Sequence, residues 1–64
     1  MFERGDKVEL VEDFTSDQGI VIKKNSVANY VCDSIMPGLS IVSFLGKQFY
    51  VETKNLKKSN ARKR

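Results

Sequence analysis

The segment from Leu39 to Leu56 constrains the fold of this chain more than any other part of its sequence. Apolar and polar residues alternate on both sides of Gly46, with the period of two that is typical of strands. Glycine adopts the positive φ that a type II′ turn needs at its first central position, so we predict a hairpin with a two-residue turn at Gly46-Lys47. This register forms one apolar face from two cross-strand pairs: Phe44 with Phe49, and Val42 with Val51.

Shorter patterns predict the other strands and loops. Residues 6–12 alternate with Val8 and Leu10 on one face, and residues 19–24 form a second strand rich in β-branched residues. Between them, residues 14–18 are expected to form a polar loop. A single helical turn at residues 53–56 should place Leu56 on the core, and residues 57–59 should add a short closing strand.

Residues 26–36 leave two alternatives open. Ser26 is suited to cap a short helix with an apolar stripe that ends at Pro37-Gly38. The run Tyr30-Val31-Cys32 is equally compatible with a strand, because valine lowers helix propensity. Either element would be an excursion between the second strand and the hairpin.

Length and composition limit the class of protein. A chain of 64 residues forms one small domain that buries only about 60% of its unfolded surface. The hydrophobic fraction of 41% and the charged fraction of 30% are those of a globular protein, and no secretory signal or membrane span is evident, so we expect a cytoplasmic protein. A chain this short that starts at Met suits a phage, plasmid or small accessory protein.

The residues that carry most chemistry are scarce. Histidine is absent and Cys32 is the single cysteine, which excludes a His-based triad, an internal disulfide and most zinc sites. Cys32 is expected to be a small buried apolar residue. We therefore expect no catalytic residues, no metal and no cofactor, and we expect that the protein is not an enzyme. The core is predicted to comprise Val8, Leu10, Val21, Val42, Phe44, Phe49, Val51 and Leu56.

The net charge of +3 is unevenly distributed. Residues 57–64 carry five basic side chains and no acid, whereas residues 1–56 carry six basic and eight acidic side chains, a net charge of −2. Residues 59–64 contain no apolar residue larger than alanine, so we expect a domain at 1–58 followed by a flexible basic tail at 59–64.

The apolar skeleton resembles that of SH3-like barrels. Gly5-Asp6-Lys7-Val8 and Gly19-Ile20-Val21 are similar to the opening half of a KOW motif, and the resemblance continues through Val42-x-Phe44, Phe49-x-Val51 and Leu56. It implies an all-β, SH3-like barrel of about five strands. KOW modules of transcription and translation proteins contact RNA, DNA or the ribosome, whereas other barrels of this plan, such as a photosystem I subunit, dock onto proteins.

Two hypotheses of function follow. The first is a module that binds nucleic acid or a ribonucleoprotein through basic residues, with Tyr50 facing outward as a stacking residue. Its site would comprise Lys23, Lys24, Lys47, Tyr50, Lys54, Lys57, Lys58, Arg62, Lys63 and Arg64.

The second hypothesis is a protein-docking adaptor that meets a basic partner with the acidic loop after the first strand. Its site would comprise Glu12, Asp13, Phe14 and Asp17. Phe14 either caps the end of the barrel or is an exposed anchor, and capping is the interpretation that we favour.

Overall fold

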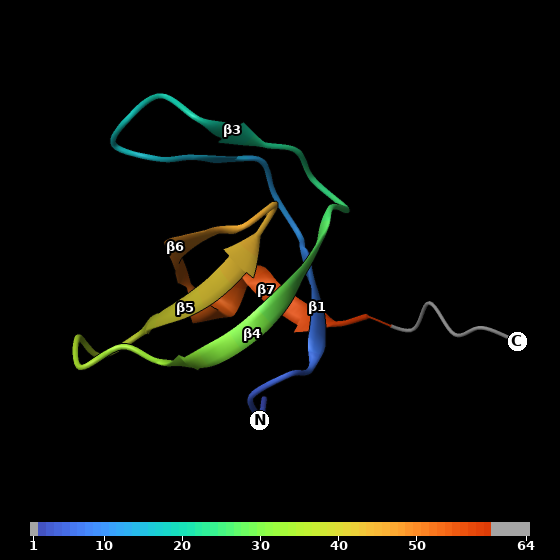
Figure 1. The fold of residues 1–64 in the computed structure, drawn as a ribbon, viewed down its shortest axis with the longest axis vertical. Helices are drawn as coiled ribbons and strands as arrows, with labels where there is room; N and C mark the ends of the chain where they lie inside the picture. The colour runs from blue at the N-terminus through green and yellow to red at the C-terminus, as the bar shows by residue number, and fades with distance from the viewer. Residues whose placement is uncertain (1, 60–64) are drawn as a thin grey trace, which may run out of the picture.

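The computed structural model describes residues 2–59, which form an all-β protein (Figure 1). The elements are β1 (Lys7–Leu10), β2 (Phe14–Thr15), β3 (Val21–Ile22), β4 (Val27–Asp33), β5 (Leu39–Phe44), β6 (Lys47–Glu52), a 3₁₀ turn η1 (Thr53–Asn55) and β7 (Leu56–Lys58). The predicted all-β class, the turn before Leu56 and the closing strand are confirmed. The helix considered for residues 26–36 is wrong, because β4 occupies most of that segment.

Five of the strands form one antiparallel sheet in the order β6-β5-β4-β1-β7. β1 lies between β4 and β7, where Val8 pairs with Ala28 and Leu10 pairs with Leu56. β2 and β3 form a separate two-stranded hairpin that projects from the sheet in the chain between β1 and β4 (Figure 1). The predicted second strand is therefore shorter than expected and pairs with residues that were expected to be a loop.

The core lies on the inner face of the sheet. Six of the predicted core residues are buried, and Phe44 is half-buried against them. Val21 was wrongly predicted, since 52% of it is exposed. Phe14 pairs with Ile22 in the hairpin, and Ile22 is the residue of β3 that turns inward. The buried residues are Val8, Leu10, Ile22, Ala28, Tyr30, Ser40, Val42, Phe49, Val51 and Leu56.

The β5–β6 hairpin has a different turn from the one predicted. Leu45 and Gly46 both have positive φ, 52° and 81°, which is the signature of a type I′ turn. Phe44 therefore pairs with Lys47, and Val42 pairs with Phe49 rather than with Val51. Moving the turn by one residue shifts the partner by two residues, so each side chain keeps the face that the sequence predicted for it.

A β-bulge interrupts the pairing of β4 with β5. Tyr30 pairs with Val42, whereas Cys32 pairs with Ile41, so Val31 is an extra residue. Without the bulge Cys32 would follow Ala28 and Tyr30 onto the inner face. With it Cys32 is exposed, and the expectation of a buried cysteine is wrong.

The bulge also creates a hydrogen bond within β4. Residues three apart on a regular strand lie on opposite faces, but the extra residue brings Asp33 to the face of Tyr30. The Tyr30 hydroxyl donates to Oδ1 of Asp33. Burial raises the pKa of the Tyr30 phenol, and the hydrogen bond to Asp33 with the negative charge of that carboxylate raises it further. Phe2 packs on the same ring, with centroids 5.4 Å apart.

The Leu45 conformation generates a stability prediction. Leu45 is 86% exposed, so its replacement loses no packing, but its left-handed backbone is unfavourable for a residue other than Gly or Asn. Leu45→Asn should raise the free energy of unfolding by about 1 kcal/mol, and the melting temperature by about 4–8 °C. Leu45→Ala, which keeps the strain, should remain near the wild type in the same thermal melts. Equal melting temperatures for all three proteins would contradict the turn assignment.

Tyr30 generates a pH prediction. Because the pKa of Tyr30 is raised on folding, its contribution to stability is complete below the ordinary tyrosine value of about 10 and is lost as the pH rises through the folded pKa. Tyr30→Phe should lower the free energy of unfolding by about 1 kcal/mol at pH 7. This difference from the wild type, measured by urea denaturation, should shrink above pH 10. Tyr50→Phe, at an exposed side chain, is the control and should keep the wild-type free energy of unfolding at pH 7.

Candidate binding groove

A groove of about 680 Å³ opens between three segments of the chain. Residues 14–18 of the β2–β3 hairpin form one wall, and residues 34–36 of the loop between β4 and β5 form another, with Leu39 beside them. Residues 47–50 of β6 form the third wall. Segments far apart in the sequence thus line one shared space.

Two aromatic rings connect the hairpin to the core at the base of this groove. Phe14 packs edge-to-face on Phe49, with ring centroids 6.1 Å apart and an interplanar angle of 74°. Phe49 is buried and Phe14 is half-buried against the core. Phe14 therefore folds back onto the core, and both rings contribute to the apolar lining of the groove.

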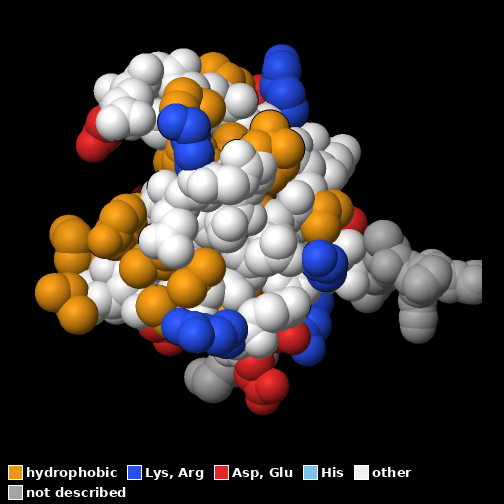
Figure 2. All heavy atoms as spheres, in the orientation of Figure 1, with side chains coloured by type: hydrophobic (Ala, Val, Ile, Leu, Met, Phe, Trp, Pro, Cys, Tyr) orange, Lys and Arg blue, Asp and Glu red, His pale blue; other side chains and the backbone are white. Residues whose placement is uncertain are grey.

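Exposed apolar side chains surround the groove. Ile35 is fully exposed, and Met36 and Tyr50 are each 57% exposed. Tyr50 faces outward, as the strand pattern predicted, because its neighbours Phe49 and Val51 are buried. Figure 2 shows hydrophobic side chains gathered at the left of the molecule, over the β4–β5 loop and the neighbouring strands. A small protein with a contiguous patch of this kind has a surface suited to contact with another molecule.

The charged residues of the groove are few. Asp17 and Lys47 line it, and Glu12 and Asp13 precede it in the chain. In the part of the chain that the structure describes, none of these three acids forms an ion pair. Asp13 instead accepts a hydrogen bond from the backbone N–H of Lys24 at 2.7 Å, which ties the start of the hairpin to its end.

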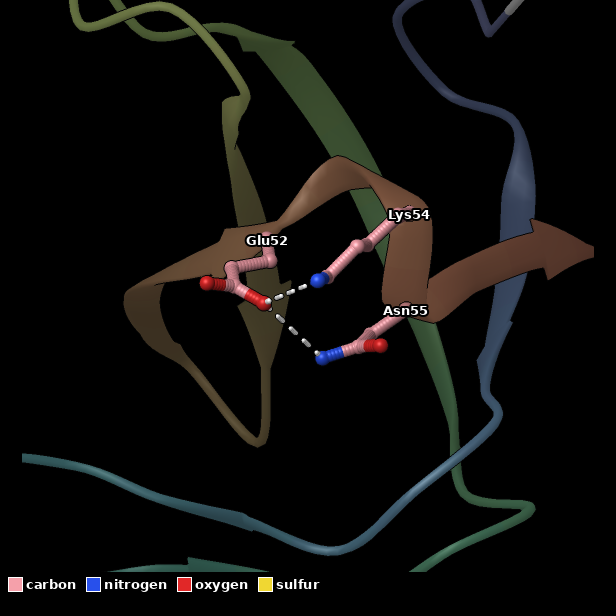
Figure 3. A network of polar contacts seen from close by, with 3 residues as sticks. All are labelled: Glu52, Lys54 and Asn55. Carbon is pink, nitrogen blue, oxygen red and sulfur yellow. Dashed lines mark hydrogen bonds and ion pairs between the residues drawn. The ribbon is translucent and has the colours of Figure 1, made fainter.

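Three of the six described lysines proposed for nucleic-acid binding lie beside acids. Lys57 Nζ is 3.8 Å from Glu9, and Lys58 Nζ is 3.5 Å from Asp6. Lys54 Nζ is 3.8 Å from Glu52, which also accepts from Asn55 (Figure 3). These pairs are largely exposed and contribute little to stability, but they lower the free positive charge.

The remaining candidate residues divide into two groups. Lys23 and Lys24 are exposed between β3 and β4 and line no part of the groove. Arg62, Lys63 and Arg64 lie outside the described residues. Ser59, at the start of the predicted tail, donates its backbone N–H to the Lys7 carbonyl at 2.9 Å.

The groove combines residues from both sequence hypotheses and adds some that neither contained. Phe14 and Asp17 come from the docking hypothesis, while Lys47 and Tyr50 come from the nucleic-acid hypothesis. The sequence analysis missed Ile35-Met36, although an apolar pair directly before Pro-Gly is an available signal of an exposed loop tip. Within residues 2–59, no cluster of three or more Cys, Asp or Glu side chains is arranged to hold a metal ion.

Comparison with protein-family models, with curated proteins and with solved structures finds no significant match to this chain. Across the described residues, no helix has the length and apolar character needed to cross a membrane.

Proposed function

We propose that this protein is a non-enzymatic docking module that binds a segment of another protein in the groove between the β2–β3 hairpin, the β4–β5 loop and β6. The observation that carries the proposal is the exposure of Ile35, Met36 and Tyr50 around one groove. Large side chains of this kind provide the apolar anchors of protein interfaces. They would be costly to leave in water unless a partner covers them.

The charge distribution supports a protein partner over a phosphate backbone. Residues 2–59 carry eight basic and eight acidic side chains, so the described domain has no net charge. Lys54, Lys57 and Lys58 already lie within 4 Å of carboxylates. In Figure 2 the basic side chains on this face stand apart from one another instead of forming one patch. Phosphate-backbone binding generally requires such a patch.

We further propose that the domain is an SH3-like barrel. Three features support this class: the strand order β6-β5-β4-β1-β7, the hairpin inserted between β1 and β4, and the 3₁₀ turn directly before the last strand. The groove-facing hairpin and the β4–β5 loop are then the two loops that a docking module of this architecture would use.

Nucleic-acid binding is the second candidate function. The run Lys57-Lys58 followed by Arg62-Lys63-Arg64 favours it, because five cations within eight residues form the densest positive charge in the sequence. A site of this kind would lie at the C-terminal end of the chain, and the groove would take no part in it.

The docking function can be tested with peptides selected on the protein. Peptides of twelve residues selected from a random display library should lose affinity about tenfold or more when Ile35→Asp places a charge at the groove. Val21→Asp is the matched control, because Val21 is an exposed apolar residue that does not line the groove. Isothermal titration calorimetry measures the peptide affinity of both variants. Equal losses for the two variants, or no loss for either, would exclude the groove as the docking site.

The nucleic-acid candidate makes its own prediction. Each phosphate contact contributes about 0.9 to the slope of log affinity against log salt, so removing residues 59–64, with three cations, should reduce the slope for a generic oligonucleotide by about 3. Fluorescence anisotropy with the full-length and truncated chains measures the change. Identical slopes, or no binding by either chain, would remove this candidate and leave docking as the better explanation.

A further inference from the structure

We propose that the partner binds as an added β-strand: an extended segment with alternating apolar residues and one basic residue pairs with the open edge of β6. This inference rests on the proposed docking function and specifies its mode and partner chemistry. β6 is the terminal strand of the five-stranded sheet, and within residues 2–59 no strand pairs with its outer side. An open edge presents unpaired N–H and C=O groups that a peptide can satisfy.

The alternation of backbone hydrogen bonds along β6 identifies which of its N–H and C=O groups face away from β5. In an antiparallel pair, successive residues alternate between bonding the neighbour strand and pointing away from it. The Thr53 N–H donates to the Gly38 carbonyl at 2.8 Å, which continues the ladder of β5 and β6 by one step. The odd-numbered residues of β6 therefore bond to β5. The backbone groups of Gln48, Tyr50 and Glu52 point away from the sheet, toward the side where a new strand would lie.

The groove lies along this same edge. Gln48, Phe49 and Tyr50 all line it, although Phe49 is buried in the core while its two neighbours are exposed on the outer face. A space that contacts consecutive residues of a strand from both faces must lie beside the strand rather than above or below it. β6 contributes residues 47–50 to the groove, and an added segment of four or five residues would span about 14–17 Å.

Two sets of apolar residues would receive alternate side chains of the added strand. Phe14 and Phe49 lie toward the core side of the edge, and Tyr50 lies on the outer side with Ile35 and Met36 across the groove. Successive side chains of an extended segment point to opposite faces, so both sets can be occupied by one strand.

The charged side chains that line the groove indicate that the partner carries a basic residue. Asp17, between β2 and β3, lines the groove and forms no ion pair among the described residues. Among residues 2–59, Lys47 is the only basic residue in the lining. The wall formed by the hairpin therefore offers the Asp17 carboxylate, and a lysine or arginine at one end of the partner segment would complement it.

The test uses synthetic peptides and leaves the protein unchanged. The probe is an acetylated seven-residue peptide that alternates valine with threonine and carries one terminal arginine, titrated into the ¹⁵N-labelled full chain. N-methylation of each peptide amide in turn removes one donor while keeping the side chain. N-methylation of an amide that faces β6 should weaken binding about threefold to tenfold, whereas N-methylation of an amide that faces away should leave the affinity unchanged. The effect should therefore alternate along the peptide. Amide exchange of Gln48 and Tyr50 should slow on binding.

A charge exchange tests the partner's basic residue. Wild-type protein should prefer the arginine peptide over the same peptide with glutamate, and Asp17→Lys should reverse the preference. Glu3→Lys, at an exposed acid outside the groove, is the control and should keep the wild-type preference. A preference unchanged by Asp17→Lys would overturn the assigned charge.

The outcomes separate this inference from the docking function itself. Binding that is insensitive to N-methylation, or sensitive at every position, would overturn strand addition while the groove stays the docking site. No binding of the probe, together with library peptides that do bind and respond to Ile35→Asp, would likewise overturn strand addition alone. If no library peptide binds the groove either, the docking function fails as well.

Discussion

The row of directly opposite residues Tyr30, Val42 and Phe49 across β4, β5 and β6 is the packing constraint on which the other features depend. All three are buried, so their strands can be neither slipped nor reversed without exposing the core. Because Phe49 points inward, Tyr50 must point outward. Phe14 packs on Phe49 and so holds the hairpin over the same strand. The row of buried residues therefore positions both the hairpin and the β6 wall of the groove.

Much of the fold could be predicted because strand alternation determines which face a residue occupies. Val8, Leu10, Val42 and Val51 are buried as expected, since each belongs to a run with a clear period of two. The register was not predictable from the same pattern. A turn at Leu45-Gly46 and one at Gly46-Lys47 leave every side chain on the same face, and the first requires a leucine with positive φ, which local propensity disfavours.

The site was harder to predict than the fold. The outward orientation of Tyr50 follows from strand alternation alone. The exposure of Ile35 and Met36 depends instead on the path of the loop after β4, which follows a bulge that no residue type in the sequence predicts. The sequence also gives the number of charged residues but does not show which of them form ion pairs. Lys57 lies beside Glu9 only because β7 runs along β1, a juxtaposition of the two ends of the chain that composition cannot show.

The position of β1 between β4 and β7 has a consequence for synthesis of the protein. β1 is synthesised before β7, yet β7, at residues 56–58, is one of its two neighbours in the sheet. Until β7 emerges, the β1 edge that it will cover remains open and Leu10 lacks its partner Leu56. Such long-range pairing slows folding and leaves the nascent sheet exposed to association with other chains. Completion of the sheet therefore has to wait until residues 56–58 have left the ribosomal tunnel.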